Sequence, residues 1–213
     1  MVYYNQGNYL DAVKTWQQAL EVYKAMGDKI GIANMLSNEG AAYFNQGDEA
    51  KSLELHLQSL KLSEAINDTL RVLTSLTNIG AIYLNKPVTY QKALEYFQRS
   101  YELSLAIKDP YSIGTSTANL GETYFKIGND SMALFYLNKS VKAYDGPEDL
   151  PYSLNYIGRV YTRQKEYAKA IKNHNQAYEI ARKLDARLDM TQSLIGMAQA
   201  YYAKGEINPA ITA

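Results

Sequence analysis

Residues 119–133 decide the fold; they read Asn-Leu-Gly-Glu-Thr-Tyr-Phe-Lys-Ile-Gly-Asn-Asp-Ser-Met-Ala. Gly121 and Tyr124 lie one helical turn apart in an otherwise helix-compatible segment. Gly128 can adopt the left-handed conformation that closes a helix, and the side chain of Asn129 can cap the next one. The stretch therefore predicts the end of one helix, a tight turn and the start of a second helix, which together form a helical hairpin.

The same pattern recurs along the whole chain at intervals of 37 to 41 residues, which indicates an internal repeat. The tyrosine recurs at Tyr3, Tyr43, Tyr83, Tyr124, Tyr161 and Tyr201. A small residue precedes the last five tyrosines by three positions: Gly40, Gly80, Gly121, Gly158 and Ala198. Another small residue follows each tyrosine by nine: Ala12, Ser52, Ala93, Ala133, Ala170 and Ala210. These columns predict close helix packing, because bulky side chains would keep the helices apart.

The register predicts an all-α array of hairpins over residues 1–213, with each helix about 25 Å long. First helices are expected over 31–46, 71–86, 111–127, 151–164 and 189–204. Second helices are expected over 8–26, 48–66, 89–108, 130–144, 166–184 and from 206 onward. The complete repeats are expected at about 30–68, 70–109, 111–149 and 150–187, flanked by partial repeats 1–28 and 188–213.

The leucine, glycine and tyrosine spacing of the first helix, followed by a small residue early in the second, resembles the tetratricopeptide repeat. The period of about 40 residues is similar to an extended subclass of that family, found in bacterial peptide-sensing regulators, sensor-kinase repeats and cargo adaptors. The resemblance implies a right-handed α-α superhelix. Departures from the pattern are Glu39 in an apolar position and Lys165 in place of the turn glycine.

Composition excludes several classes of function. The 22 basic residues balance 22 acidic ones, and no apolar run is long enough for a membrane span, so we expect neither nucleic-acid binding nor membrane insertion. Zero cysteines exclude thiolate chemistry. The two histidines, His56 and His174, occupy one repeat position shared with Phe97 and Leu137, which predicts packing rather than catalysis. We therefore expect no enzyme activity, no metal and no cofactor.

The resemblance implies that first helices line a concave groove and that an asparagine two residues before the glycine grips a peptide backbone. Asn38, Asn78 and Asn119 hold that place. A side-chain amide offers donors and acceptors suited to an extended peptide. The residue after each column tyrosine faces the same surface in the family, and Phe44, Leu84 and Phe125 would offer apolar contacts there. The alternative is that these asparagines have no binding role.

The charges are unevenly distributed. Residues 1–149 carry 13 basic and 17 acidic side chains, whereas residues 150–190 carry 8 basic and 4 acidic ones. Asn155, Arg159 and Arg163 share one helix face, with Lys126 on the preceding first helix. An arginine fork pairs well with a carboxylate, so an acidic or C-terminal carboxylate group on a partner is the predicted occupant. The alternative is a solvated face with weak ion pairs to Glu122.

The sequence favours a non-catalytic scaffold that binds proteins or extended peptides in a concave groove. One alternative is a sensor or relay segment of a bacterial signalling protein, such as a sensor kinase or transcriptional regulator. A third interpretation is self-association through apolar hairpin faces at the two ends. Neither end has a polar capping element, so we expect a segment of a longer protein. The lack of a targeting segment favours the cytoplasm, whereas a membrane-anchored sensor would place the chain in the periplasm.

Overall fold

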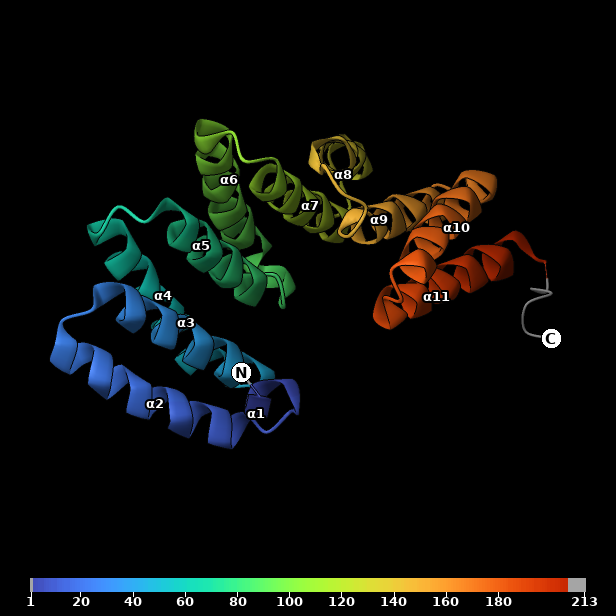
Figure 1. The fold of residues 1–213 in the computed structure, drawn as a ribbon. Helices are drawn as coiled ribbons and strands as arrows, with labels where there is room; N and C mark the ends of the chain where they lie inside the picture. The colour runs from blue at the N-terminus through green and yellow to red at the C-terminus, as the bar shows by residue number, and fades with distance from the viewer. Residues whose placement is uncertain (1, 207–213) are drawn as a thin grey trace. The chain divides into compact units, whose positions relative to one another are not determined.

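The computed structural model describes residues 2–206, which form α-helices, one 3₁₀ helix and no strand (Figure 1). The helices are α1 (Val2–Asn5), α2 (Tyr9–Met26), α3 (Lys29–Asn45), α4 (Glu49–Ala65), α5 (Thr69–Tyr83), η1 (Pro87–Thr89), α6 (Tyr90–Ile107), α7 (Pro110–Ile127), α8 (Asp130–Ala143), α9 (Leu150–Arg163), α10 (Tyr167–Lys183) and α11 (Arg187–Lys204). The predicted helices are confirmed to within about three residues at each end. The helix expected from 206 onward lies outside the described residues.

The chain divides into two compact units, Met1–Leu103 and Ser104–Ala213, with the boundary inside α6. In the first unit, α2, α3, α4 and α5 pack consecutively. In the second unit, α7 packs on α8, and α10 packs between α9 and α11. Within residues 2–206, no helix combines the length and apolar character that a membrane span requires. The division into four complete and two partial repeats stays a prediction.

Turns between helices use the predicted chemistry. Gly128 has a φ of 92° and closes α7, and the Asn129 side chain accepts a hydrogen bond from the backbone N–H of Met132 at 3.1 Å. The aspartates that follow the second helices recur at a similar place in the repeat, which predicts that they are capping residues: Asp28, Asp68, Asp109 and Asp185. The prediction is confirmed for three of them, whose side chains accept a hydrogen bond from the first turn of the following helix: Asp28, Asp68 and Asp109. The same prediction for Asp185 is wrong. Asp185 occupies the left-handed turn position at φ 52°, and Ala186 precedes α11 instead.

The glycine column lies against the large residue that its own hairpin places sixteen or seventeen positions later. A Cβ atom at Gly80 would lie 2.5 Å from the Phe97 ring, and one at Gly121 would lie 2.5 Å from Leu137 Cγ. Gly40 and Gly158 face His56 and His174 in the same way. The second small column is almost completely buried in the described repeats: Ala12, Ser52, Ala93, Ala133 and Ala170. The two helices of a hairpin can therefore approach closely because a glycine on the first helix lies opposite a large side chain on the second.

Two of the column tyrosines pack against a tyrosine of their second helix. The rings of Tyr83 and Tyr96 stack with centroids 5.6 Å apart, and those of Tyr124 and Tyr136 stack at 5.5 Å. Such offset aromatic pairs stabilise beyond their buried area. Hairpin packing thus accounts for part of the tyrosine excess.

Replacing Lys165 with glycine is expected to stabilise the protein by roughly 0.5–1 kcal/mol, because Lys165 adopts φ 62° at the turn between α9 and α10. Urea denaturation followed by circular dichroism measures the change. The reverse change, Gly128→Ala at φ 92°, is the matched control and should destabilise. If Lys165→Gly destabilised the protein, the assignment of Lys165 to a left-handed backbone conformation would be wrong.

Candidate functional site

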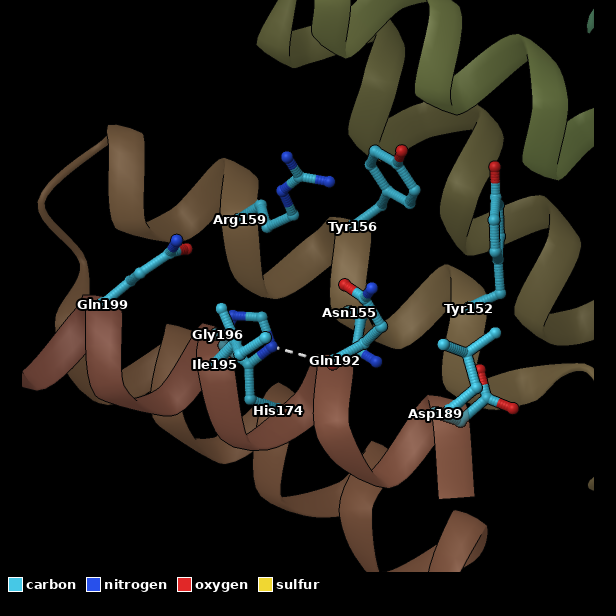
Figure 2. A pocket seen from close by; sticks show the side chains of 11 residues that line it. Tyr152, Asn155, Tyr156, Arg159, His174, Asp189, Gln192, Ile195, Gly196 and Gln199 are labelled. Atoms are coloured by element: carbon cyan, nitrogen blue, oxygen red, sulfur yellow. Dashed lines mark hydrogen bonds between the residues drawn. The ribbon is translucent and has the colours of Figure 1, made fainter. Parts of the chain in front are cut away.

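A cavity of about 380 Å³ lies in the second unit, between α9 and α11 and above α10 (Figure 2). Both flanking helices are first helices of their hairpins. The cavity is lined by Tyr152, Asn155, Tyr156, Arg159, His174, Leu188, Asp189, Gln192, Ile195, Gly196 and Gln199. The α9 and α11 walls each contribute two apolar side chains, and three amides and two opposite charges supply specific polar contacts. This composition is typical of a binding pocket.

A chain of hydrogen bonds fixes the floor of the cavity. The Ser193 hydroxyl donates to the Asp189 carbonyl at 2.8 Å, so its oxygen accepts from Asn155 Nδ2 at 2.9 Å. Asn155 Oδ1 then faces His174 Nδ1 at 2.8 Å, the contact drawn in Figure 2. Because that oxygen can only accept, Nδ1 carries the proton in the neutral ring. His174 Nε2 therefore keeps a lone pair, and it has no hydrogen-bond partner among the described residues.

His174 is a buried packing residue, only 1% exposed. Its ring lies against two glycines: a Cβ at Gly158 would approach within 2.5 Å and one at Gly196 within 2.2 Å. Burial, with a smaller contribution from the nearby charge of Arg159, lowers the pKa of His174 to about 4. Burial alone lowers the pKa of His56 to about 4. Both rings are therefore neutral near pH 7. Their burial against the glycine column confirms the predicted packing role of the two histidines.

Arg159 forms the charged wall of the cavity. Its guanidinium lies 4.8 Å from the centroid of the Tyr156 ring and 5.2 Å from that of Phe125. These rings hold the guanidinium in place, and no carboxylate of residues 2–206 pairs with it. Its N–H groups can therefore receive an external anion.

Arg163, predicted to share this role, is already occupied. It forms an ion pair with Asp130, donates to the Phe125 carbonyl at 2.9 Å and lies 4.1 Å from the Phe125 ring centroid. Lys126 lies 3.4 Å from Glu122. The structure thus separates the predicted basic cluster: Arg159 faces the cavity, while Arg163 and Lys126 have internal acidic partners.

Glu122 of α7 is 9% exposed and contacts α9. Both of its oxygens accept hydrogen bonds, one from the Tyr152 hydroxyl and one from the Tyr156 hydroxyl at 2.6 Å. Burial, followed by the charge of Glu122, raises the pKa of both tyrosines. The Glu122 carboxylate is therefore already occupied by two tyrosine hydroxyls.

A second cavity, of about 200 Å³, lies in the first unit between α3 and α5. It brings together Phe44 and Asn78, two residues that the sequence predicts for peptide contacts, with His56 beside them. Asn45 and Tyr4 also line it, and Asn45 Nδ2 donates to the Tyr4 hydroxyl at 2.7 Å.

Two predicted residues take other places. Leu84 is 6% exposed and belongs to the core, so the prediction that it offers an apolar contact to a ligand is wrong. Asn155 is 7% exposed, and its amide is consumed by His174 and Ser193, so it shapes the cavity floor instead of anchoring a partner's charge. Asn38 and Asn119 are half-buried on α3 and α7, outside the lining of either cavity.

Sequence reasoning missed Asp189, Gln192 and Gln199, which line the α11 wall. The available signal was Gly196, which stands where earlier repeats place Asn38, Asn78, Asn119 and Tyr156. Without a side chain at that position, α11 can pack directly against the His174 ring, which forms part of the cavity lining. Within residues 2–206, no group of three or more potential metal ligands is gathered.

Solved structures with the same fold are numerous but distant in sequence. BtubC (BKLC) from P. vanneervenii aligns with a TM-score of 0.79 and 17% identity over 96% of this chain and 87% of that one. A Rap protein complexed with Competence and Sporulation Factor gives 0.82 and 17%, over 98% of this chain and 58% of that one. A STAND protein with a tetratricopeptide repeat sensor from Pyrococcus horikoshii gives 0.78 and 18%, over 94% and 31%. This chain therefore spans less than two thirds of the latter two proteins.

Comparison with curated protein sequences gives no match. The sequence profile of the tetratricopeptide repeat matches residues 1–65, 89–145 and 149–213, which is most of the chain. The helical hairpins and the solved neighbours agree with that match, and they confirm the predicted fold class, an α-α superhelix. The chain belongs to the tetratricopeptide repeat family.

Proposed function

We propose that this chain is a non-catalytic module that binds a protein segment or extended peptide along its first helices. The observation that carries the proposal is the cavity between α9 and α11, with an uncommitted arginine in its wall and a rigid polar floor. Family membership supports a protein-interaction scaffold. A Rap protein of the same fold has been solved with a peptide factor, which agrees with this use of the fold.

The binding residues proposed for the second unit are Arg159, for a negatively charged group, and Phe125, whose ring supports it. In the first unit, Asn78 and Phe44 line the smaller cavity and would contact the ligand there. Asn38 and Asn119, which are half-buried on α3 and α7, remain proposed contacts for the peptide backbone. Each of these roles can be tested by single substitution.

Selection from a random peptide library tests the proposal. The protein is expected to enrich peptides, and Gln192→Trp should reduce their affinity roughly tenfold or more by filling the cavity. Gln192 is exposed, so the substitution should leave the fold intact. Gln176→Trp, on an exposed position of α10 outside the cavity, is the matched control and should leave affinity unchanged. Failure to enrich any peptide, or equal loss in both variants, would refute the proposal.

A sensor or relay role in a signalling protein is the second candidate. It is supported by the match to the STAND protein, in which the tetratricopeptide repeats form a sensor. In this case, ligand binding should change the distance between spin labels placed on α4 and α8, one in each unit. An unchanged distance distribution at saturating peptide would leave the scaffold role as the better account.

A further inference from the structure

The cavity between α9 and α11 carries opposite charges at its two ends. Arg159 and Gln199 lie at one end, and Tyr152 and Asp189 lie at the other (Figure 2). The inference drawn from this arrangement concerns the chemistry of the bound segment, and it rests on the proposed peptide-binding function.

At the positive end, the Arg159 guanidinium is the group that can donate hydrogen bonds to a bound anion. The Arg159 guanidinium is stacked on two rings and has no acidic partner within residues 2–206. An arginine held in this way loses little side-chain freedom when it binds a carboxylate with two parallel hydrogen bonds. The neighbouring His174 is neutral and adds no positive charge.

The negative end is formed by Asp189 at the start of α11. No basic side chain of the described residues pairs with its carboxylate; the nearby Arg187 pairs with Asp185 instead. Burial raises the pKa of Asp189, and the pKa of Asp149 is raised by burial and by the charges of Glu148 and Asp189. Burial therefore disfavours the charged form of Asp189, and a cationic group placed beside it in the cavity would stabilise that charge.

The distance between the ends sets the length of the ligand. Asp189 and Gln199 are ten residues apart on α11, which corresponds to about 15 Å along the helix axis. An extended chain advances about 3.3–3.6 Å per residue, so roughly four residues cover this distance. The buried acceptor of the floor, His174 Nε2, lies between the two ends.

We propose that this cavity selects an extended peptide segment that carries an acidic group at the Arg159 end and a basic group about four residues away at the Asp189 end. The basic group can be a lysine or arginine side chain or a free N-terminus. The acidic group can be a side chain or a C-terminal carboxylate.

Fluorescence anisotropy with labelled, terminally capped pentapeptides tests the spacing. Lys-Ala-Thr-Ala-Glu and its reverse, Glu-Ala-Thr-Ala-Lys, carry the charges four residues apart in the two chain directions. Ala-Lys-Glu-Thr-Ala has the same composition with adjacent charges and serves as the control. At least one spaced peptide is expected to bind roughly tenfold more tightly than the control, and this preference should weaken with added salt.

Charge variants test the assigned ends. Arg159→Gln and Asp189→Asn should each remove the preference for spaced charges. Arg159→Asp should instead prefer Lys-Ala-Thr-Ala-Lys, and Asp189→Lys should prefer Glu-Ala-Thr-Ala-Glu; such gains cannot arise from misfolding. Equal affinity for spaced and adjacent charges, or no binding of any pentapeptide, would overturn this inference. The library selection decides separately whether the protein binds peptides at all, so the two failures are distinguishable.

Discussion

Acidification from pH 7 to pH 4 is expected to destabilise the protein by about 3 kcal/mol for each of its two buried histidines. The folded-state pKa of both His56 and His174 is about 4, below the ordinary value of 6.5. Above pH 6.5 both states are neutral and the full stability is present. As the pH falls from 6.5 toward 4, the unfolded chain binds protons that the folded chain does not, so stability is lost.

The variant His56→Leu isolates this effect. Leu137 already occupies the same repeat position, where it packs against Gly121. A leucine at position 56 should therefore pack against Gly40 in the same way. Burial raises the pKa of Glu39, which makes that group stabilise the fold at low pH, and the comparison of variant with parent cancels its contribution. The variant should therefore lose about 3 kcal/mol less between pH 7 and pH 4.

Trp16 supplies the readout for His56. It is the sole tryptophan of the chain, is 6% exposed and belongs to the same unit. Urea denaturation followed by its fluorescence at several pH values gives the free energy of unfolding of that unit. Parallel pH profiles for parent and His56→Leu would show that His56 is not held neutral by burial.

Gly121→Ala is expected to destabilise the second unit by about 2–3 kcal/mol, because the added Cβ would lie 2.5 Å from Leu137 Cγ and 3.1 Å from the Leu137 backbone nitrogen. Leu137 is fully buried, so neighbouring side chains surround it. In an open helix, the same substitution would instead stabilise by about 1 kcal/mol. The sign of the change, measured by urea denaturation and circular dichroism, therefore reports helix contact directly.

A double-mutant cycle with Leu137→Ala provides the control. Leu137→Ala alone should cost about 2–5 kcal/mol through loss of buried side-chain volume. In that background, Gly121→Ala should cost nothing or stabilise, because the methyl group enters the space left by the leucine. Additive losses in the double variant would mean that the two residues do not meet.

Repetition allowed the helices and turns to be predicted from the sequence. A glycine that closes a helix and an aspartate or asparagine that caps the next one act through local interactions. Because the pattern occurs six times, exceptions such as Lys165 did not obscure it. The capping prediction failed at Asp185 because that turn is displaced by one residue, so the aspartate falls on the left-handed position. The packing role of the histidines was predictable too, since the repeat position is shared with Phe97 and Leu137.

The candidate site depended on contacts between helices that are distant in sequence. Arg159 and Arg163 look equivalent on a helix face, yet only Arg163 meets Asp130 of α8 and gains an ion pair. Asn155 looks like a ligand-facing amide, but Ser193 and His174 take up both ends of its side chain. Asp189 had no visible partner in the sequence and becomes a site residue only because α11 lies beside α9. The sequence by itself determined the family, the hairpins and the packing columns, because these follow from local and periodic interactions. Only the tertiary structure decided which charged groups stay unpaired around a cavity, because partner choice depends on three-dimensional proximity between helices.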